Sequence, residues 1–255
     1  SLATQIQANM LPHIFPAFPN RTDFDIYASM DPAKEVGGDF YDYFLIDDNH
    51  LGLVMADVSG KGVPAALFMM TARTLIKDAA LEGLDPSSVM FRVNERLDES
   101  NKDGLFVTVW LGILEISTGK LTASNAGHEN PVIYRKGKHF EVFKDPHGFV
   151  IGGLEGMRYK DYEIRLNKGD KLFLYTDGLP EATNSDQKLY TVERMAKELN
   201  LYQDGSPQEI IEGMQISVND FVGDAPQFDD LTMLCIEIKD EDIKNNAQTR
   251  SDDLQ

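Results

Sequence analysis

A single cysteine, Cys235, is present in the chain. One cysteine can form neither a disulfide within the chain nor a cluster of thiolate metal ligands. Because Cys235 lies in the apolar run 231–236, we expect it to be a small core residue rather than a nucleophile. Such sparse use of cysteine is typical of proteins in a reducing, cytoplasmic environment.

Basic residues are also scarce: 24 Lys and Arg stand against 42 Asp and Glu, which gives a formal net charge of −18. On average such a surface repels nucleic acid and anionic lipid, so nucleic acid is not an expected partner. An acidic excess can also reflect carboxylates gathered to bind hard cations, although composition alone does not separate this from solubility.

The chain lacks a run long and apolar enough to span a bilayer, since the longest candidate, residues 63–72, contains Pro64 and begins close to Lys61. No signal peptide is evident. Hydrophobic residues still make up 42% of the chain, which is enough for a sizeable core. The first residue is Ser1 rather than Met, and we expect the chain to be part of a longer protein.

Apolar periodicity predicts helices grouped in blocks rather than alternating with strands. The expected helices are residues 2–11, 63–81, 87–99, 191–199 and 207–221. Ser87 is the expected N-cap of the third. The first places Leu2, Ile6 and Met10 on one face, as at the end of a longer linker helix.

Alternating apolar and polar residues predict strands at residues 24–30, 40–46, 51–58, 106–116, 120–126, 131–135, 139–143, 159–166, 171–176 and 231–238. Glycine-containing connections indicate three antiparallel hairpins, at residues 117–119, 136–138 and 167–170. This order favours an α+β fold of antiparallel sheets covered by helices. We interpret residues 1–19 as a linker helix and connection, residues 20–239 as one domain and residues 240–255 as a disordered tail.

Four aspartates share one local setting, at the beginning or end of a strand and beside a residue that permits a tight backbone. They are Asp39, Asp57, Asp177 and Asp229. A short carboxylate can reach a metal ion that lies between strand ends, and a neighbouring glycine lets the backbone approach a ligand. The alternative is that Asp-Gly pairs only mark turns. Asp57 is the least compatible with the turn alternative, because this residue ends an apolar run and a buried charge needs a partner.

Other motifs are weaker guides to chemistry. Lys61 is followed by Gly62, so this glycine-rich segment fails the phosphate-loop pattern, which requires serine or threonine there. Ser59 lacks the preceding glycine of a nucleophile elbow. His128 lies between two predicted strands, and we favour a turn satisfied by its own side chains over direct catalysis.

Five segments together resemble the metal-dependent protein phosphatase (PPM) family, and more closely its bacterial branch of stage II sporulation protein E and sigma-factor regulators. They are residues 35–42, 57–62, 125–131, 175–182 and 229–232, in the order and spacing of the family. Jointly these motifs are highly specific, and the resemblance covers roughly residues 20–239. It implies a four-layer α-β-β-α sandwich of two antiparallel sheets flanked by helices.

The resemblance also implies a centre of two Mn²⁺ or Mg²⁺ ions. Asp39 and Asp57 would bind the pair, with Asp39 as the bridge, and the backbone carbonyl of Val58 would bind one ion. Asp177 and Asp229 would complete the second site. The adjacent Asp230 is either a further ligand or a supporting residue.

Two positions depart from the wider family. Many relatives carry an arginine that grips phosphate, and here Lys34 is the nearby candidate for phosphate binding, with a solvated loop lysine as the equal alternative. Relatives also carry a histidine, proposed as a general acid, where this chain has Ser59. A third metal in some relatives uses an acidic residue that matches Glu181 and another at the position of His128, which is not acidic.

The implied function is that of a protein serine/threonine phosphatase in signal transduction, which hydrolyses phosphoserine or phosphothreonine with a metal-activated water. The expected substrate is an anti-sigma-factor antagonist in a bacterium. The full-length protein is expected to carry an N-terminal sensor domain, with any membrane anchor in that region, and a homodimer is among the assemblies allowed. Two alternatives stay open: a non-catalytic interaction domain of the same fold and a phosphoesterase for small molecules.

Overall fold

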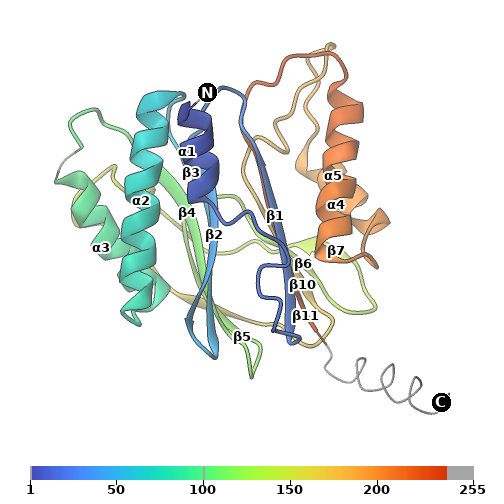
Figure 1. The fold of residues 1–255 in the computed structure, drawn as a ribbon, viewed down its shortest axis with the longest axis horizontal. Helices are drawn as coiled ribbons and strands as arrows, with labels where there is room; N and C mark the ends of the chain where they lie inside the picture. Colours follow the sequence, from blue (N-terminus) through green and yellow to red (C-terminus); the bar gives the residue numbers. More distant parts are fainter. Residues whose placement is uncertain (1, 100, 240–255) are drawn as a thin grey trace.

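The computed structural model describes residues 2–99 and 101–239. These form two β-sheets stacked face to face, with helices on both outer sides (Figure 1). The helices are α1 (Leu2–Met10), α2 (Val63–Leu81), α3 (Pro86–Asp98), α4 (Val192–Leu201) and α5 (Pro207–Val222). The strands are β1 (Phe24–Asp31), β2 (Asp39–Asp47), β3 (His50–Val58), β4 (Val107–Glu115), β5 (Lys120–Ala126), β6 (Val132–Tyr134), β7 (Phe140–Val142), β8 (His147–Gly148), β9 (Tyr162–Arg165), β10 (Lys171–Tyr175) and β11 (Leu231–Ile238).

The first sheet has the order β1-β11-β10-β6-β7, and α4 and α5 cover its outer face. The second sheet has the order β2-β3-β4-β5-β8, with β9 also paired to β5, and α2 and α3 cover its outer face. All pairs are antiparallel except the short β5–β8 pair. The predicted α+β sandwich is therefore confirmed.

The third predicted hairpin is wrong. β9 pairs with β5 in the second sheet, whereas β10 pairs with β11 and β6 in the first. The connection is a tight turn, in which the Asp170 amide donates to the Asn167 carbonyl at 2.9 Å. A turn of this kind reverses the direction of the chain but does not determine which strand each flanking strand pairs with. The chain can therefore pass from one sheet to the other here.

One smaller prediction also needs correction, and one strand was missed. Asp85, not Ser87, caps α3, because its carboxylate accepts from the Ser88 amide at 2.8 Å while the Ser87 hydroxyl donates to the same oxygen. The two-residue strand β8 was not predicted, since it is too short to show a pattern. The expected disordered tail, residues 240–255, lies outside the described residues.

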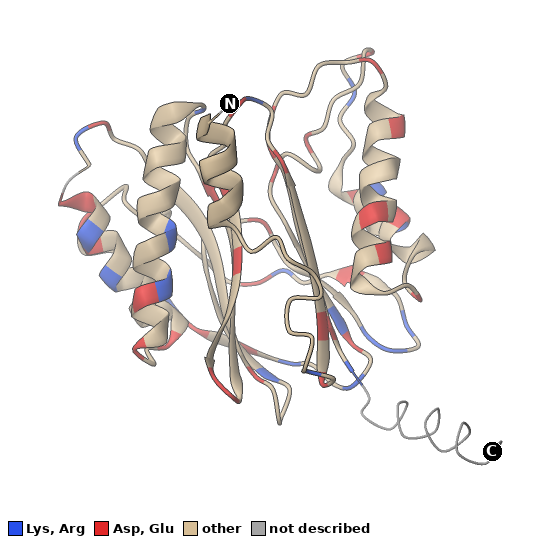
Figure 2. Cartoon of the chain, viewed as in Figure 1, with Lys and Arg blue, Asp and Glu red and all other residues tan. Residues whose placement is uncertain are grey.

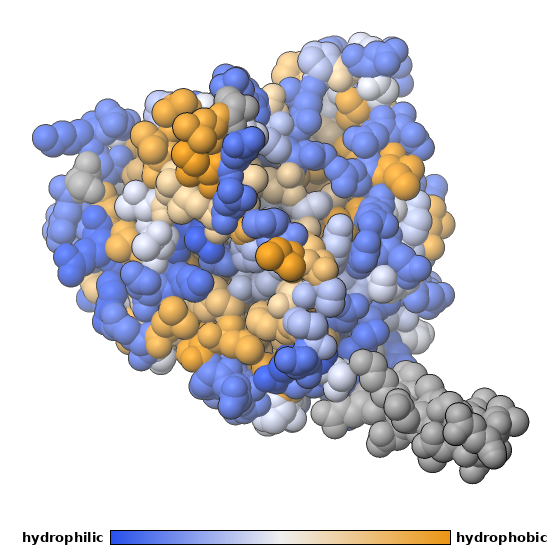
Figure 3. Space-filling model, viewed as in Figure 1, coloured by the Kyte–Doolittle hydropathy of each residue, from blue (hydrophilic) through white to orange (hydrophobic). Residues whose placement is uncertain are grey.

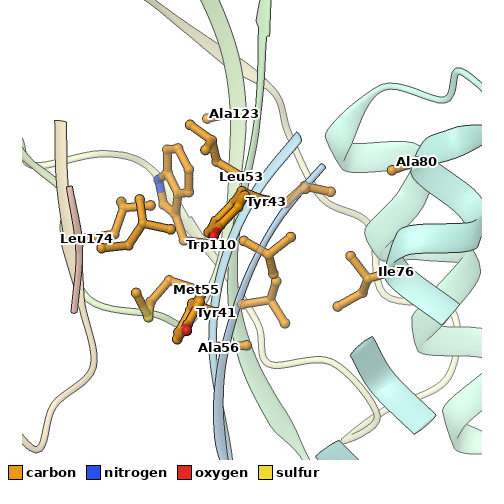
Figure 4. Close-up of a cluster of buried hydrophobic side chains, with 14 of the residues drawn as sticks. Tyr41, Tyr43, Leu53, Met55, Ala56, Ile76, Ala80, Trp110, Ala123 and Leu174 are labelled. Atoms are coloured by element: carbon orange, nitrogen blue, oxygen red, sulfur yellow. The ribbon is translucent and has the colours of Figure 1, made fainter. Parts of the chain in front are cut away.

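The core lies mainly between the sheets and beneath α2 and α3. Trp110 is fully buried there, and Figure 4 shows its ring extending toward Leu174 of the opposite sheet, with Ile76 of α2 on the other side of the strands. A second cluster packs α4 and α5 against the first sheet and contains Cys235, as predicted for a core cysteine. Burial also raises the pKa of the Cys235 thiol.

The predicted apolar face of α1 does not pack inward. Leu2 and Ile6 are 72% and 48% exposed, and Figure 3 shows apolar surface around this helix. The buried residue of α1 is instead Gln7, whose side-chain amide donates to the Gly37 carbonyl at 2.7 Å and accepts from the Gly37 amide at 2.9 Å. This helix therefore attaches to the loop that leads into β2. None of the described helices is long and apolar enough to cross a membrane.

Candidate metal centre

The predicted aspartates lie together at one edge of the two sheets, where the strands that carry them begin or end. Asp39 begins β2 and faces Asp57, near the end of β3, across the antiparallel ladder. In the other sheet, Asp177 follows β10 and Asp229 precedes β11, and because these strands are antiparallel neighbours their two ends meet. This edge lies uppermost in Figure 1.

Asp39 is the point at which the sheets are joined. Its carboxylate accepts a hydrogen bond from the Thr176 hydroxyl and another from the Thr232 hydroxyl, each at 2.6 Å. Both threonines belong to the strand ends of the opposite sheet, and Asp39 is only 1% exposed. The position of this carboxylate is therefore fixed by the packing of one sheet on the other.

The carboxyl groups lie close enough to change one another's protonation. Burial, and then the charges of Asp57 and Asp230, raise the pKa of Asp39 well above its ordinary value. Burial and the charge of Asp177 raise the pKa of Asp57 to about 8, against hydrogen bonding from Asp39 that lowers it. Burial and the charge of Asp229 likewise raise the pKa of Asp177. All four predicted aspartates therefore share one site.

Asp57 lies close enough to interact with both Asp39 and Asp177, and these contacts lower the pKa values of Asp57 and Asp177 against the effect of burial. In the part of the chain that the structure describes, no three Asp, Glu, His or Cys side chains are already arranged to hold a metal ion. The donor chemistry nevertheless fits hard divalent cations, because every donor here is a carboxylate oxygen and the mutual repulsion is relieved by positive charge. The Val58 carbonyl lies at the same strand ends, next to Gly38 and one residue after Asp57, because a Cβ on Gly38 would come within 2.9 Å of its oxygen.

Asp230 supports the loop that carries Asp39. Its carboxylate accepts from the backbone amides of Ala33 and Gly38, each at 2.9 Å, and from that of Asp39 at 3.3 Å. These bonds wrap residues 33–39 around one buried carboxylate. Of the two roles that the sequence left open for Asp230, the geometry favours the supporting one.

Two glycines are required by this close approach. A Cβ on Gly37 would lie 2.1 Å from the Asp230 carboxylate, and one on Gly178 would lie 1.9 Å from the Asp230 carbonyl oxygen. No side chain fits at either distance. The Gly-Gly-Asp and Asp-Gly motifs therefore reflect crowding around Asp230, in addition to any turn preference.

The two lysines differ in position. Lys34 is exposed on the loop 33–39, and its role in phosphate binding stays a prediction. Lys61, which the sequence argument considered only as part of a failed phosphate loop, reaches the site: its Nζ lies 3.3 Å from the Asp229 carboxylate and donates to the Phe228 carbonyl. Its charge lowers the pKa of both Asp177 and Glu181. Its nearness to Asp57 in sequence was the signal that could have identified it.

The turn at His128 is satisfied by its own side chains, as the sequence favoured, because the His128 backbone amide donates to the Asn125 side chain at 2.7 Å. The partners of the His128 ring come from other strands. Its Nδ1 lies 2.9 Å from the Thr108 hydroxyl and its Nε2 lies 2.9 Å from the Tyr175 carbonyl. Burial lowers its pKa to about 4, so the ring is neutral at physiological pH. The Ser59 hydroxyl is engaged as well, because it accepts from the Phe106 amide at 2.9 Å.

Glu129 is a further acidic neighbour that the sequence argument did not single out. Burial, and then the charges of Asp177 and Glu181, raise its pKa. Burial and the charges of Asp177 and Asp229 raise the pKa of Glu181 in turn. Glu129 directly follows His128 in sequence, so an acidic group does stand close to the position where some relatives place one.

Known proteins resemble this chain in both sequence and fold. Protein IcfG of Synechocystis sp. is 27% identical over 259 residues, covering 91% of this chain and 40% of that protein. The phosphoserine phosphatase RsbU of Bacillus subtilis is 27% identical over 221 residues, covering 87% of this chain and 65% of that protein. The chain therefore spans less than two thirds of the length of these relatives.

Solved structures share the same architecture. The SiaA-PP2C domain of Pseudomonas aeruginosa aligns with a TM-score of 0.80 at 24% identity, covering 92% of this chain and 94% of that chain. The structure of the RsbU and RsbW domains of Rv1364c from Mycobacterium tuberculosis aligns with a TM-score of 0.73 at 25% identity, covering 85% and 60%. The model of the stage II sporulation protein E (SpoIIE) family matches residues 47–239. This chain belongs to the SpoIIE family.

Proposed function

We propose that the chain is the catalytic domain of a metal-dependent protein serine/threonine phosphatase. The observation that carries this proposal is the meeting of Asp39, Asp57, Asp177 and Asp229, from four strand ends and two sheets, in one site. Burial and mutual repulsion raise the carboxyl pKa values of the first three. The similarity to the phosphoserine phosphatase RsbU supports the same activity.

The ions we propose are two Mn²⁺ or Mg²⁺ ions, held by Asp39, Asp57, Asp177, Asp229 and the Val58 carbonyl. When bound, such ions neutralise phosphoryl oxygens and make water acidic enough to attack near neutral pH. The role of the protein is to hold the metal-binding side chains in fixed positions. Thr176 and Thr232 orient Asp39, and Asp230 fixes the loop before it. The positive charge of Lys61 stands where the phosphate of a substrate would lie near Asp229.

Three residues that the sequence raised as possible nucleophiles or bases are engaged or buried, which supports attack by water. Cys235 is buried in the second core cluster, with a raised pKa. Ser59 accepts a backbone hydrogen bond, and both ring nitrogens of His128 have partners. A covalent phosphoenzyme is therefore not part of the proposal.

We propose a phosphoprotein substrate, of the kind represented by an anti-sigma-factor antagonist, for a full-length cytoplasmic protein with an N-terminal sensor domain. The similarity to RsbU and to a solved chain that contains RsbU and RsbW domains supports this setting. A homodimer and a membrane anchor outside this chain belong to the same proposal.

The test is Mn²⁺-dependent release of phosphate from a phosphoserine peptide, from p-nitrophenyl phosphate and from a nucleotide. The proposal expects turnover of the peptide that is lost in Asp39→Asn and Asp177→Asn, together with weaker Mn²⁺ binding by calorimetry in both variants. Turnover of the nucleotide alone would favour the small-molecule phosphoesterase. Tight Mn²⁺ binding without any turnover would favour a non-catalytic interaction domain.

A further inference from the structure

A cleft of about 540 Å³ adjoins the metal centre. One end is lined by Lys61, Glu181 and Asp229, so the cleft and the centre share a wall. The rest of the lining combines apolar side chains, among them Leu189, Val222 and Phe228, with polar ones such as Asn219 and Gln227. Its sides are the segment that follows Asp177 and the segment that runs from the end of α5 to the start of β11, near the upper edge in Figure 1.

Large apolar side chains stand exposed on its two sides. Leu189 is 53% exposed on one side and Phe228 is 57% exposed on the other, whereas Val218 and Leu231 are buried at the base. Exposed apolar groups that cluster in a concave surface commonly mark a binding site, whereas single exposed apolar residues do not. The volume lies within the ordinary range of roughly 300–1,000 Å³ for ligand sites.

The cleft is preformed. On one side, Thr183 and Leu189 form a β-bridge, and the Tyr190 amide donates to the Ala182 carbonyl at 2.8 Å. On the other side, the Gln227 side-chain Nε2 donates to the Asp31 carbonyl at 2.9 Å and to the Asp229 carbonyl at 2.8 Å. A ligand therefore pays little ordering cost on binding.

The charge of the lining restricts the occupant. Among the described residues that line the cleft, Lys61 is the single basic one, and it lies at the end shared with the metal centre. Asp31 and Glu181 add negative charge to the rim. A second phosphate or an acidic side chain would be repelled there, whereas an uncharged apolar group can contact Leu189, Val222 and Phe228 without that repulsion.

We propose that this cleft binds an apolar side chain of the phosphoprotein substrate, close in sequence to the phosphorylated residue. The inference rests on the proposed function, because a cleft that shares Asp229 with the centre places its occupant beside the position of the substrate phosphate. Occupancy of the cleft then positions the phosphate over the carboxylates, which gives selectivity for phosphoproteins over small phosphate esters.

The experiment uses phosphoserine peptides on an alanine background in which one leucine is moved through each flanking position. The kcat/KM with Mn²⁺ is measured for each peptide and for p-nitrophenyl phosphate. One leucine position is expected to raise kcat/KM by about ten-fold or more over the leucine-free peptide, as one apolar contact in a pocket commonly does.

The variants Leu189→Ser and Phe228→Ser test the walls, and each changes a side chain that is more than half exposed, so folding is not at risk. Both are expected to reduce the ratio of leucine-peptide to p-nitrophenyl phosphate kcat/KM by about five-fold or more. Leu201→Ser is the matched control, since Leu201 is 69% exposed on α4 and does not line the cleft. The control should retain the ratio.

The inference is overturned if wild-type protein turns over p-nitrophenyl phosphate but no leucine position improves a peptide, or if the preference survives in both cleft variants. If no substrate releases phosphate in Mn²⁺, the proposed function itself fails, and this inference fails with it. The two failures are therefore distinguishable.

Discussion

Asp39 and Asp57 lie directly opposite each other on neighbouring antiparallel strands. Like charges at such a cross-strand position repel and destabilise the sheet. Here the repulsion is increased by burial, which raises the pKa of both carboxyl groups. A stable fold that retains this pair is storing unfavourable electrostatic energy that a cation would release, and this relationship leads to the first two predictions.

Asp39→Asn should stabilise the metal-free protein and abolish its activity. The amide removes the charge that opposes Asp57, and its oxygen can still accept from Thr176 and Thr232, because both hydroxyls donate to the same Asp39 oxygen. We expect a higher melting temperature in EDTA, weaker Mn²⁺ binding, and a fall in phosphatase kcat of more than about 100-fold, as when a group that stabilises transition-state charge is removed. Asp48→Asn, in the exposed turn after β2, is the control and should change neither quantity. A metal-free Asp39→Asn protein no more stable than wild type would contradict the electrostatic account.

Asp57 predicts how the stability of the metal-free protein depends on pH. Its pKa rises from 3.8 to about 8 on folding, so the native state holds this proton more tightly than the unfolded state. The contribution is complete below 3.8 and is lost as the pH rises through about 8. We expect Asp57→Asn to exceed wild type in melting temperature by about 2 °C or more at the alkaline end, with little difference at the acidic end. Thermal scans in EDTA across this range provide the measurement, and parallel curves for the two proteins would exclude the shift.

The same shift predicts proton release on cation binding. Ligands must be deprotonated to bind a metal, so Mn²⁺ should displace protons from wild-type protein below about pH 8, and fewer from Asp57→Asn. Calorimetry in two buffers of different ionisation enthalpy measures this number. Equal proton release from the two proteins would show that Asp57 is already ionised before the metal binds.

Lys61→Ala should impair use of a phosphorylated substrate without weakening metal binding. The Lys61 ammonium lies beside Asp229, so removing it eliminates a positive charge that both attracts phosphate and competes with the cations. We expect KM for a phosphopeptide to rise by about three- to ten-fold while Mn²⁺ affinity stays equal or increases. Lys34→Ala is the matched comparison, and a larger rise in KM for that variant would return phosphate binding to the residue favoured by the sequence.

Asp230→Ala should loosen the loop that carries Asp39. It leaves the amides of Ala33, Gly38 and Asp39 without their acceptor, and each buried donor left unpaired costs about 1–3 kcal/mol. Mn²⁺ affinity should fall by about 10- to 100-fold, the usual effect of losing a residue that orients a ligand. Asp224→Ala, on an exposed turn, serves as the control for both readings. Unchanged Mn²⁺ affinity in Asp230→Ala would show that the loop holds Asp39 without it.

The sequence was a good guide to the elements and to the aspartates, because both depend on local pattern. The bounds of α2, β5 and β11 agree with their predicted ranges, since periodicity and glycine or proline breaks are adjacent in the chain. The aspartates could be grouped because antiparallel strands necessarily return their ends to one edge.

What the sequence could not give is the choice of distant partners. β9 and β10 have the sequence pattern of a hairpin, yet β9 pairs with β5 and β10 pairs with β11. Lys61 and Lys34 both lie within five residues of a predicted aspartate, and only the packing around the Asp229 segment distinguishes them. The supporting role of Asp230 depends on an amide row 191 to 197 residues away, which no local motif can signal.

The centre is built half from each sheet, with Asp39 and Asp57 on one and Asp177 and Asp229 on the other. An ion held between the halves would crosslink the two layers, so its binding free energy would add directly to the free energy of unfolding. The lifetime of the folded domain would then follow the availability of manganese or magnesium around it, and a cell starved of the ion would lose the protein as well as its activity.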